Sequence, residues 1–178
     1  MRRSFARRYC PACKAVVTTP ADPVAAMRAF PAALRRVIAT LSARERAFRP
    51  RAGEWSPREL VAHLADTEIA FGWRLRMVLA HDRPTLAPFD ENALATALNH
   101  SSYKPKPTLE LFSVLRRANC DLLKAATPGQ WKRMGRHPDR GETTVRQLAD
   151  HRAHHDLNHL AKLRDKLRRI RLQEFQSR

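Results

Sequence analysis

The tetrapeptide at residues 56–59, Ser-Pro-Arg-Glu, constrains the fold most, because it is a complete signal for the start of an α-helix. A serine N-cap accepts a hydrogen bond from the amide three residues later, and the glutamate there reaches back to the serine amide. Proline suits the first helical position, which needs no amide donor. The apolar residues that follow lie on one helical stripe: Leu60, Leu64, Phe71, Leu75 and Val78. We therefore predict an amphipathic helix that ends near residues 81–84.

Three other stretches show the same apolar periodicity. The first covers residues 23–41 and contains Pro31, which should kink or restart the helix because proline lacks an amide donor. Another covers residues 108–126, with Thr108 as the expected N-cap. The last covers residues 144–172 and opens with a second capping box, Thr-Val-Arg-Gln. Four substantial helices are therefore expected.

These helices predict an all-α protein built as a four-helix bundle over residues 23–172. The chain has only five glycines and no convincing alternating strand pattern, which argues against a sheet protein. A long connection of residues 82–107 holds four prolines and separates the second and third helices, with a short helix expected around residues 90–97. That length allows a topology other than up-down-up-down. Residues 173–178 are expected to form a C-terminal tail.

Residues 1–22 are basic and lack apolar periodicity, so we predict a disordered N-terminal extension outside the bundle. This extension carries a CxxC motif, Cys10 and Cys13, which resembles half of a zinc knuckle and would need two further ligands. Cys120 lies far along the chain on a predicted helix. The CxxC motif is therefore an incomplete motif, a site of intermolecular zinc binding or a redox pair. A separate alternative is that translation starts at Met27, so that the extension is not part of the natural protein.

The composition indicates the cellular location of the protein and its possible partners. Three cysteines cannot pair completely within one chain, and neither a signal peptide nor an apolar stretch long enough to span a membrane is present, so we expect a cytoplasmic protein without membrane contact. The net charge of +17 would attract nucleic acid. However, the arginines are spread along the chain and no DNA-reading motif is evident, so nucleic acid is a possible partner that the sequence does not favour.

The strongest chemical signal is a group of histidines in the last predicted helix. At about 100° per residue, His155 and His159 lie about 40° apart on the helix surface and point where the aliphatic residues point. His151 lies at the margin of that stripe, and His154 faces away. Two neutral imidazoles one turn apart on an inward face are well placed to chelate a divalent cation. His63, at the edge of the stripe of the second helix, is the natural candidate for a third ligand.

The histidines sit in two segments that resemble one protein family. The segment GEWSPRELVAHLAD at residues 53–66 and the segment GETTVRQL at residues 141–148, followed by HDLNHL at residues 155–160, are similar to the signatures of the DinB-like (YfiT-like) metalloenzymes. The resemblance covers roughly residues 25–169. Two positions depart from the pattern: Asn158 stands where many members have histidine, and Lys162 where many have glutamine.

The resemblance implies a bundle with up-down-down-up order, a homodimer, and a metal site made by His63, His155 and His159. It also implies a small-molecule substrate and chemistry that uses a low-molecular-weight thiol, since relatives include thiol-dependent S-transferases and a mycothiol-dependent maleylpyruvate isomerase. Imidazole ligands suit zinc or nickel best as the divalent metal ion.

Three neutral ligands leave open positions on the ion, which is typical of a catalytic site. An open position favours an anionic thiolate or hydroxide, so the sequence predicts an enzyme that activates a thiol or water, of S-transferase or hydrolase type. Asp66, about one turn after His63, and Asp156, beside His155, are candidates for supporting the ligands or transferring protons. The alternative is a basic nucleic-acid-binding or stress-response interaction protein with a structural or vestigial metal site.

Overall fold

A computed structural model describes residues 4–49, 51, 53–88 and 90–176. Four long helices form the bundle: α1 (Pro23–Ala39), α3 (Pro57–Ala80), α5 (Pro105–Ala125) and α7 (Val145–Gln176). Short helices fill the connections: α2 (Ala43–Ala47), α4 (Glu91–Ala97), the 3₁₀ turn η1 (His100–Ser102) and α6 (Pro128–Lys132). Two small antiparallel hairpins complete the fold: β1 (Phe5–Cys10) with β2 (Ala15–Pro20), and β3 (Met134–His137) with β4 (Gly141–Thr144).

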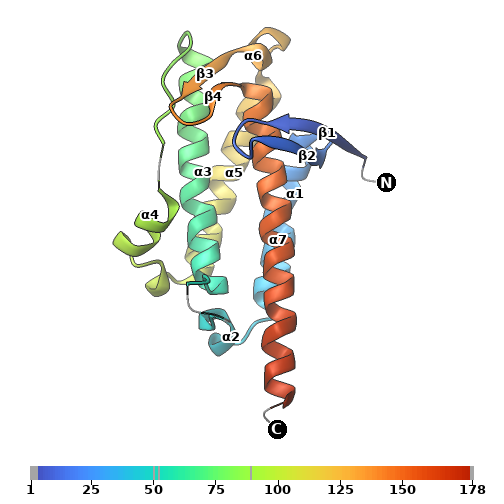
Figure 1. Cartoon of the computed structure of the whole chain (residues 1–178), viewed down its shortest axis with the longest axis vertical. Coiled ribbons are helices and arrows are strands. Elements are labelled where there is room, and N and C mark those ends of the chain that lie inside the picture. The colour runs from blue at the N-terminus through green and yellow to red at the C-terminus, as the bar shows by residue number, and fades with distance from the viewer. Residues whose placement is uncertain (1–3, 50, 52, 89, 177–178) are drawn as a thin grey trace.

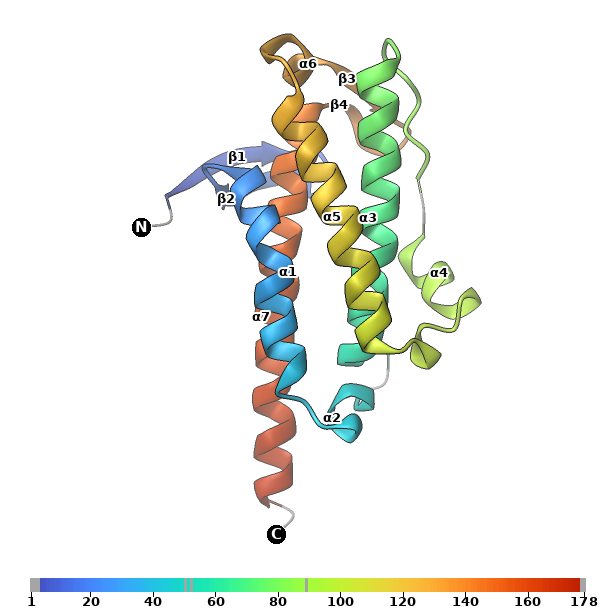
Figure 2. The ribbon, with the colours of Figure 1, turned by 180° about the vertical axis from the view of Figure 1, so that it is seen from behind.

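The bundle has the expected up-down-down-up order. In Figures 1 and 2, α1 and α7 run in one direction, whereas α3 and α5 both run in the other. The parallel pair α3 and α5 requires the chain to return along the whole bundle, and the connection that carries α4 does so. The long proline-containing segment between the second and third main helices therefore sets the topology.

Both predicted capping boxes are present. The Ser56 amide donates to Glu59 Oε2 at 2.8 Å, and the Glu59 amide donates to Ser56 Oγ at 3.3 Å. The Thr144 amide donates to Gln147 Oε1 at 2.9 Å, and the Gln147 amide donates to Thr144 Oγ1 at 3.1 Å. Because these contacts are local in sequence, they fix where α3 and α7 begin and hence the register of the side chains that follow.

Three helix predictions need correction. The α1 helix continues through Pro31 and does not restart there, since Phe30 and Leu34 pack into the core on either side of the proline. The α5 helix begins one turn earlier than predicted, at Pro105, and Thr108 Oγ1 donates to the Lys104 carbonyl at 2.8 Å from within the first turn. The α7 helix continues to Gln176, so it includes most of the predicted tail; residues 177–178 lie outside the described residues.

The predicted disorder of residues 1–22 is also wrong for the described residues 4–22. β1 and β2 form a hairpin that lies across α7 (Figure 1). The β-branched run at residues 16–19 suits a strand. Thr19 is fully buried, and its hydroxyl donates to the Asp150 carbonyl of α7 at 3.2 Å. Docking against α7 therefore stabilises a two-stranded hairpin, which would be marginally stable by itself.

The apolar core is divided into two clusters by a layer of buried polar side chains. One cluster gathers residues such as Leu64, Phe112 and Leu163, and the other gathers residues such as Leu75, Leu123 and Ala149. Between them in sequence, on α3, α5 and α7, lie Glu68, Arg116 and Asp156, all nearly inaccessible to solvent.

Arg116 of α5 is the centre of this polar layer. Its guanidinium is paired with Asp156 of α7, lies 2.8 Å from Glu68 Oε2 of α3 and donates to the Met27 carbonyl of α1 at 3.1 Å. Asn119 Nδ2 donates to Glu68 Oε1 at 2.8 Å. Burial lowers the pKa of Arg116, but the carboxylates of Asp156 and Glu68 outweigh this effect and raise the pKa above its ordinary value. The guanidinium is therefore charged. One side chain thus connects all four main helices.

Candidate metal centre

The three predicted histidine ligands meet at one point between α3 and α7. His63 Nε2 lies 3.3 Å from His155 Nε2, and His159 Nε2 lies 3.0 Å from His155 Nε2. One ligand nitrogen from each ring falls within 4.8 Å of the others. Nitrogens that share an ion at about 2.1 Å would be about 3.0–3.4 Å apart for bond angles between 90° and 109°. The observed spacings therefore fit a common divalent ion.

The α3 helix delivers His63 in a fixed orientation. The capping box at Ser56 sets the register, and His63 follows two turns later with only 1% of its surface exposed. The ring of Trp55, just before the cap, packs against the imidazole at a centroid distance of 4.6 Å. Trp55 thus covers one side of the His63 imidazole, and Nε2 of that ring faces His155 of α7.

The α7 helix delivers the other two ligands from the flank of its buried face. The buried positions of this helix include Val145, Ala149, Ala153 and Leu163, whereas His155 and His159 are partly exposed. We predicted that His155 and His159 point where the aliphatic residues point, but both lie at the edge of that stripe. An edge position suits a reactive site better, because a ligand there meets both another helix and a solvent-accessible cavity.

The electrostatic surroundings keep the imidazoles neutral. Burial is the main cause: it lowers the pKa of His63 to about 2, with His159 and Arg152 adding to the effect, and that of His159 to about 4, with Lys162 and Arg152 adding to it. The pKa of His155 is also well below its ordinary value, mainly through burial. Neutral imidazoles have the free lone pair that a metal requires.

Glu91 is a site residue that sequence reasoning missed. It is the first residue of α4, and its Oε2 lies 3.7 Å from His63 Nδ1, on the far side of the ring from the ligand nitrogen. A carboxylate behind a ligating imidazole fixes its tautomer and orientation. The Nδ1 atoms of His155 and His159 are buried without a hydrogen-bond partner among the described residues. The predicted start of a helix at Asp90 was the only local signal, since nothing in the sequence relates residue 91 to residue 63.

Two cavities adjoin the histidine cluster at its α7 ligands. The first, of about 380 Å³, is lined by His155 and by polar side chains that include Arg140 and Arg152. The second, of about 580 Å³, is lined by His155, His159 and Lys162. Glu91 lines both cavities. The histidine cluster therefore lies where small molecules have access from two sides.

The two aspartates predicted to assist the site have other partners. Asp66 Oδ2 accepts a hydrogen bond from His100 Nε2 at 2.7 Å. Asp156 is buried and accepts from both terminal nitrogens of Arg116 in the polar layer. Within the described part of the chain, no hydrogen bond or ion pair joins either carboxylate to His63, His155 or His159. The arrangement gives Asp156 a structural role in holding α7 against α5.

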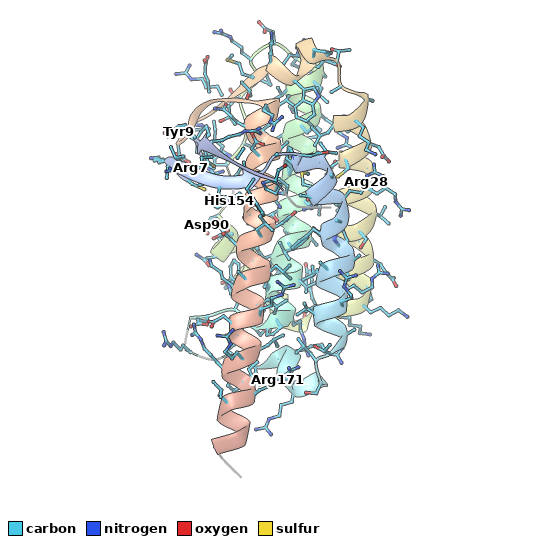
Figure 3. The ribbon with its side chains drawn as sticks, turned by 90° about the vertical axis from the view of Figure 1, so that its right-hand side faces the viewer. Arg7, Tyr9, Arg28, Asp90, His154 and Arg171 are labelled. Carbon is cyan, nitrogen blue, oxygen red and sulfur yellow. The ribbon has the colours of Figure 1, made fainter. Side chains whose placement is uncertain are left out.

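Basic side chains project from several elements of the structure. Figure 3 shows arginines projecting from three separate elements, with Arg7 on the hairpin, Arg28 on α1 and Arg171 on α7. Two arginines, Arg116 and Arg152, are buried in the interior. In the part of the chain that the structure describes, no helix is long and apolar enough to cross a membrane.

Comparison with known proteins gives consistent matches. A family model described as the DinB superfamily matches residues 26–163. A protein of Oceanobacillus iheyensis that carries the name "Putative metal-dependent hydrolase" is 26% identical over 132 residues, which cover 74% of this chain and 76% of that protein. The solved structure of YfiT from Bacillus subtilis, described as "a probable metal-dependent hydrolase with an unusual four-helix bundle topology", matches with a TM-score of 0.79 at 26% identity, over 83% of this chain and 85% of that one.

A more distant match shows the fold alone. The mycothiol-dependent maleylpyruvate isomerase aligns with a TM-score of 0.63 at 14% identity, over 79% of this chain and 59% of that one. The hairpin at residues 5–20 lies outside the residues that the family model matches.

Proposed function

This chain belongs to the DinB superfamily, and from that premise we propose that it is a divalent-metal-dependent enzyme in which His63, His155 and His159 hold the ion. The observation that carries the proposal is the convergence of three neutral imidazole nitrogens, 3.0 and 3.3 Å apart, beside two cavities. One buried and two partly buried imidazoles that converge without a shared cation would be unfavourable, since each loses hydration without a compensating partner. The metal-dependent names of the relatives support the same conclusion.

The proposed reaction is attack of a small nucleophile, water or a low-molecular-weight thiol, on a small electrophilic substrate. A bound divalent ion would supply a Lewis acid that lowers the pKa of the nucleophile at its open position. Zinc and nickel are the metals best suited to the imidazole set. Water as nucleophile makes the protein a hydrolase, and a thiol makes it an S-transferase.

The chain's own residues would assist in two ways. Glu91 Oε2 lies 3.7 Å from His63 Nδ1 and would orient that ring electrostatically, and its position at both cavities allows its carboxylate to receive a proton released by the nucleophile. Arg152, fully buried beside the histidines, and Lys162 make the site electropositive and so favour an anionic nucleophile or an anionic substrate group.

The setting of the enzyme is also proposed rather than observed. Three free cysteines are compatible with the reducing cytoplasm. Family membership supports a homodimer. Size-exclusion chromatography with light scattering would measure the mass of the protein in solution directly.

Metal content and activity together test the proposal. Protein purified without a histidine tag should retain a divalent metal at the histidine cluster, and His155→Ala should lose it. His81→Ala, which removes an exposed histidine at the end of α3, is the matched control and should retain the metal. Binding below a tenth of an equivalent, unchanged by His155→Ala, would exclude a metal site.

The nucleophile is identified by a screen of the metal-loaded protein. Activated esters and amides test hydrolysis, and thiols of low molecular weight paired with electrophilic acceptors test S-transfer. Activity in either screen should disappear in His63→Ala and persist in His81→Ala. Steeply salt-dependent DNA binding that persists in His63→Ala, with no activity in either screen, would favour the nucleic-acid-binding alternative.

A further inference from the structure

The CxxC motif does not stand alone, because the hairpin brings it to a histidine of α7. Cys10 ends β1, and Cys13 lies in the turn before β2. Cys10 Sγ lies 3.3 Å from His151 Nδ1, and Cys13 Sγ lies 3.9 Å from the same nitrogen. The two sulfurs and one imidazole nitrogen all fall within 4.8 Å of one another.

These distances match the edges of a tetrahedral zinc site. With zinc–sulfur bonds of about 2.3 Å and a zinc–nitrogen bond of about 2.0–2.1 Å, a sulfur and a nitrogen on one ion are about 3.6 Å apart. The Cys13 amide also donates to Cys10 Sγ at 3.4 Å, a contact that stabilises a thiolate. We propose that Cys10, Cys13 and His151 form a second metal site, of Cys₂His type, that takes zinc. This site is independent of the proposed enzymatic function.

The site is organised by contacts that do not involve the metal. Arg8 of β1 pairs with Asp150 at 2.8 Å, and Thr19 of β2 donates to the Asp150 carbonyl at 3.2 Å. One turn further along α7, His154 Nδ1 lies 3.0 Å from the Thr18 carbonyl. Because these contacts lie on both sides of His151 in the sequence, the docked hairpin presents its two thiols to that imidazole.

The position of the turn gives the second site a role. Pro11, Ala12 and His151 line the same cavity of about 380 Å³ that His155 lines. The rings of His151 and His155 are one helical turn apart, with centroids separated by 6.0 Å. Zinc held by the turn would therefore fix one wall of the cavity beside the three-histidine cluster. Three protein ligands leave a fourth tetrahedral position for water or another donor.

The two sites differ in chemical softness, and this difference makes them distinguishable. Thiolates select zinc and other soft ions, whereas three imidazoles also accept nickel, copper or iron. Cobalt(II) in a site with thiolate ligands shows an intense sulfur-to-metal charge-transfer band in the near ultraviolet, which an imidazole site lacks. Cobalt-substituted protein therefore reports on the second site separately.

The experiment compares zinc content and the cobalt spectrum of protein that is purified without a histidine tag under reducing conditions. The wild-type chain should bind two equivalents of zinc and show the charge-transfer band. Cys10→Ser/Cys13→Ser should bind one equivalent and lose the band. His63→Ala/His155→Ala should lose the other equivalent and keep the band, which separates failure of this proposal from failure of the proposed function. Cys120→Ala is the control, since this third cysteine is buried in the core, and it should keep both.

A second measurement protects the test against a variant that fails to fold. In the folded wild-type protein, zinc should protect two thiols from alkylation, and a zinc chelator should expose them. The proposal is overturned if the wild-type protein shows no charge-transfer band, if Cys10→Ser/Cys13→Ser binds as much zinc as the wild type, or if mass spectrometry finds a Cys10–Cys13 disulfide under reducing conditions.

Discussion

Replacement of Arg116 with methionine should destabilise the bundle strongly, because this guanidinium is 1% exposed and joins all four main helices. Methionine fills a similar volume but leaves the carboxylates of Glu68 and Asp156 buried, with Arg152 still nearby as a cation. Removing one partner of a buried ion pair costs about 3–5 kcal/mol. For a chain of this size, that corresponds to a fall in Tm of about 6–20 °C.

Urea unfolding followed by circular dichroism, in EDTA at pH 7.5, measures this loss of unfolding free energy. Arg117→Met removes the neighbouring exposed arginine and should change the unfolding free energy by less than about 0.5 kcal/mol. A double variant, Arg116→Met/Asp156→Leu, should recover part of the loss, because it removes one of the two stranded carboxylates.

The pH dependence gives an independent check of the cause. Burial already raises the pKa of Asp156 in the folded chain, and loss of Arg116 raises it further. A carboxyl group with a raised pKa in the folded state is relieved by protonation, so the stability gap between Arg116→Met and the wild type should narrow as the pH falls towards 4 and widen as it rises. A gap below about 1 kcal/mol at pH 7.5 would refute the role of Arg116 as the connector of the four helices.

Three further predictions concern the metal centre and the fold around it. Glu91→Gln should weaken zinc affinity about 10-fold in calorimetric titrations by loosening His63, and a change smaller than twofold would contradict this role. Gly135→Ala should cost about 1–3 kcal/mol in urea unfolding, since an added Cβ would lie 2.8 Å from Leu86, while Gly129→Ala, with nothing closer than 3.9 Å, should cost much less. Metal-free protein should lose stability as the pH falls below about 6.5. The reason is that histidines of the unfolded chain are protonated there, whereas the buried His63, with a pKa of about 2, stays neutral in the folded chain. Equal urea midpoints at pH 7.5 and 5.0 would contradict this.

Features that depend on neighbours in sequence were predictable. The starts of α3 and α7 follow from capping boxes four residues long, and both are present. The pairing of His155 with His159 follows from the helical repeat. The family resemblance supplied His63 and the bundle topology, which helical geometry alone left open. The matching model and the YfiT structure confirm the family and the fold.

Features that depend on residues far apart in sequence were not predictable from local patterns. The hairpin at residues 5–20 exists because Thr19 and Arg8 find Asp150 of α7, more than 130 positions away. Glu91 was missed for the same reason. The prediction for Asp156 rested on its place beside His155, but adjacent residues on a helix point about 100° apart, so this carboxylate faces Arg116 in the polar layer.

The CxxC motif also depends on a residue far away in sequence. From the sequence, Cys10 and Cys13 lacked further ligands, and His151 was placed at the margin of the helical stripe without a partner. The structure joins these two unassigned features, since the hairpin lies on the face of α7 that carries His151.

Anomalous diffraction at the zinc absorption edge, from crystals of the zinc-loaded protein, would show whether His63, His155 and His159 share one divalent ion. A shared ion should give a strong anomalous peak within about 2.0–2.2 Å of all three Nε2 atoms, with the Glu91 carboxylate near His63 Nδ1. An absent peak, with the imidazoles hydrogen-bonded to one another or to water in zinc-loaded crystals, would contradict it.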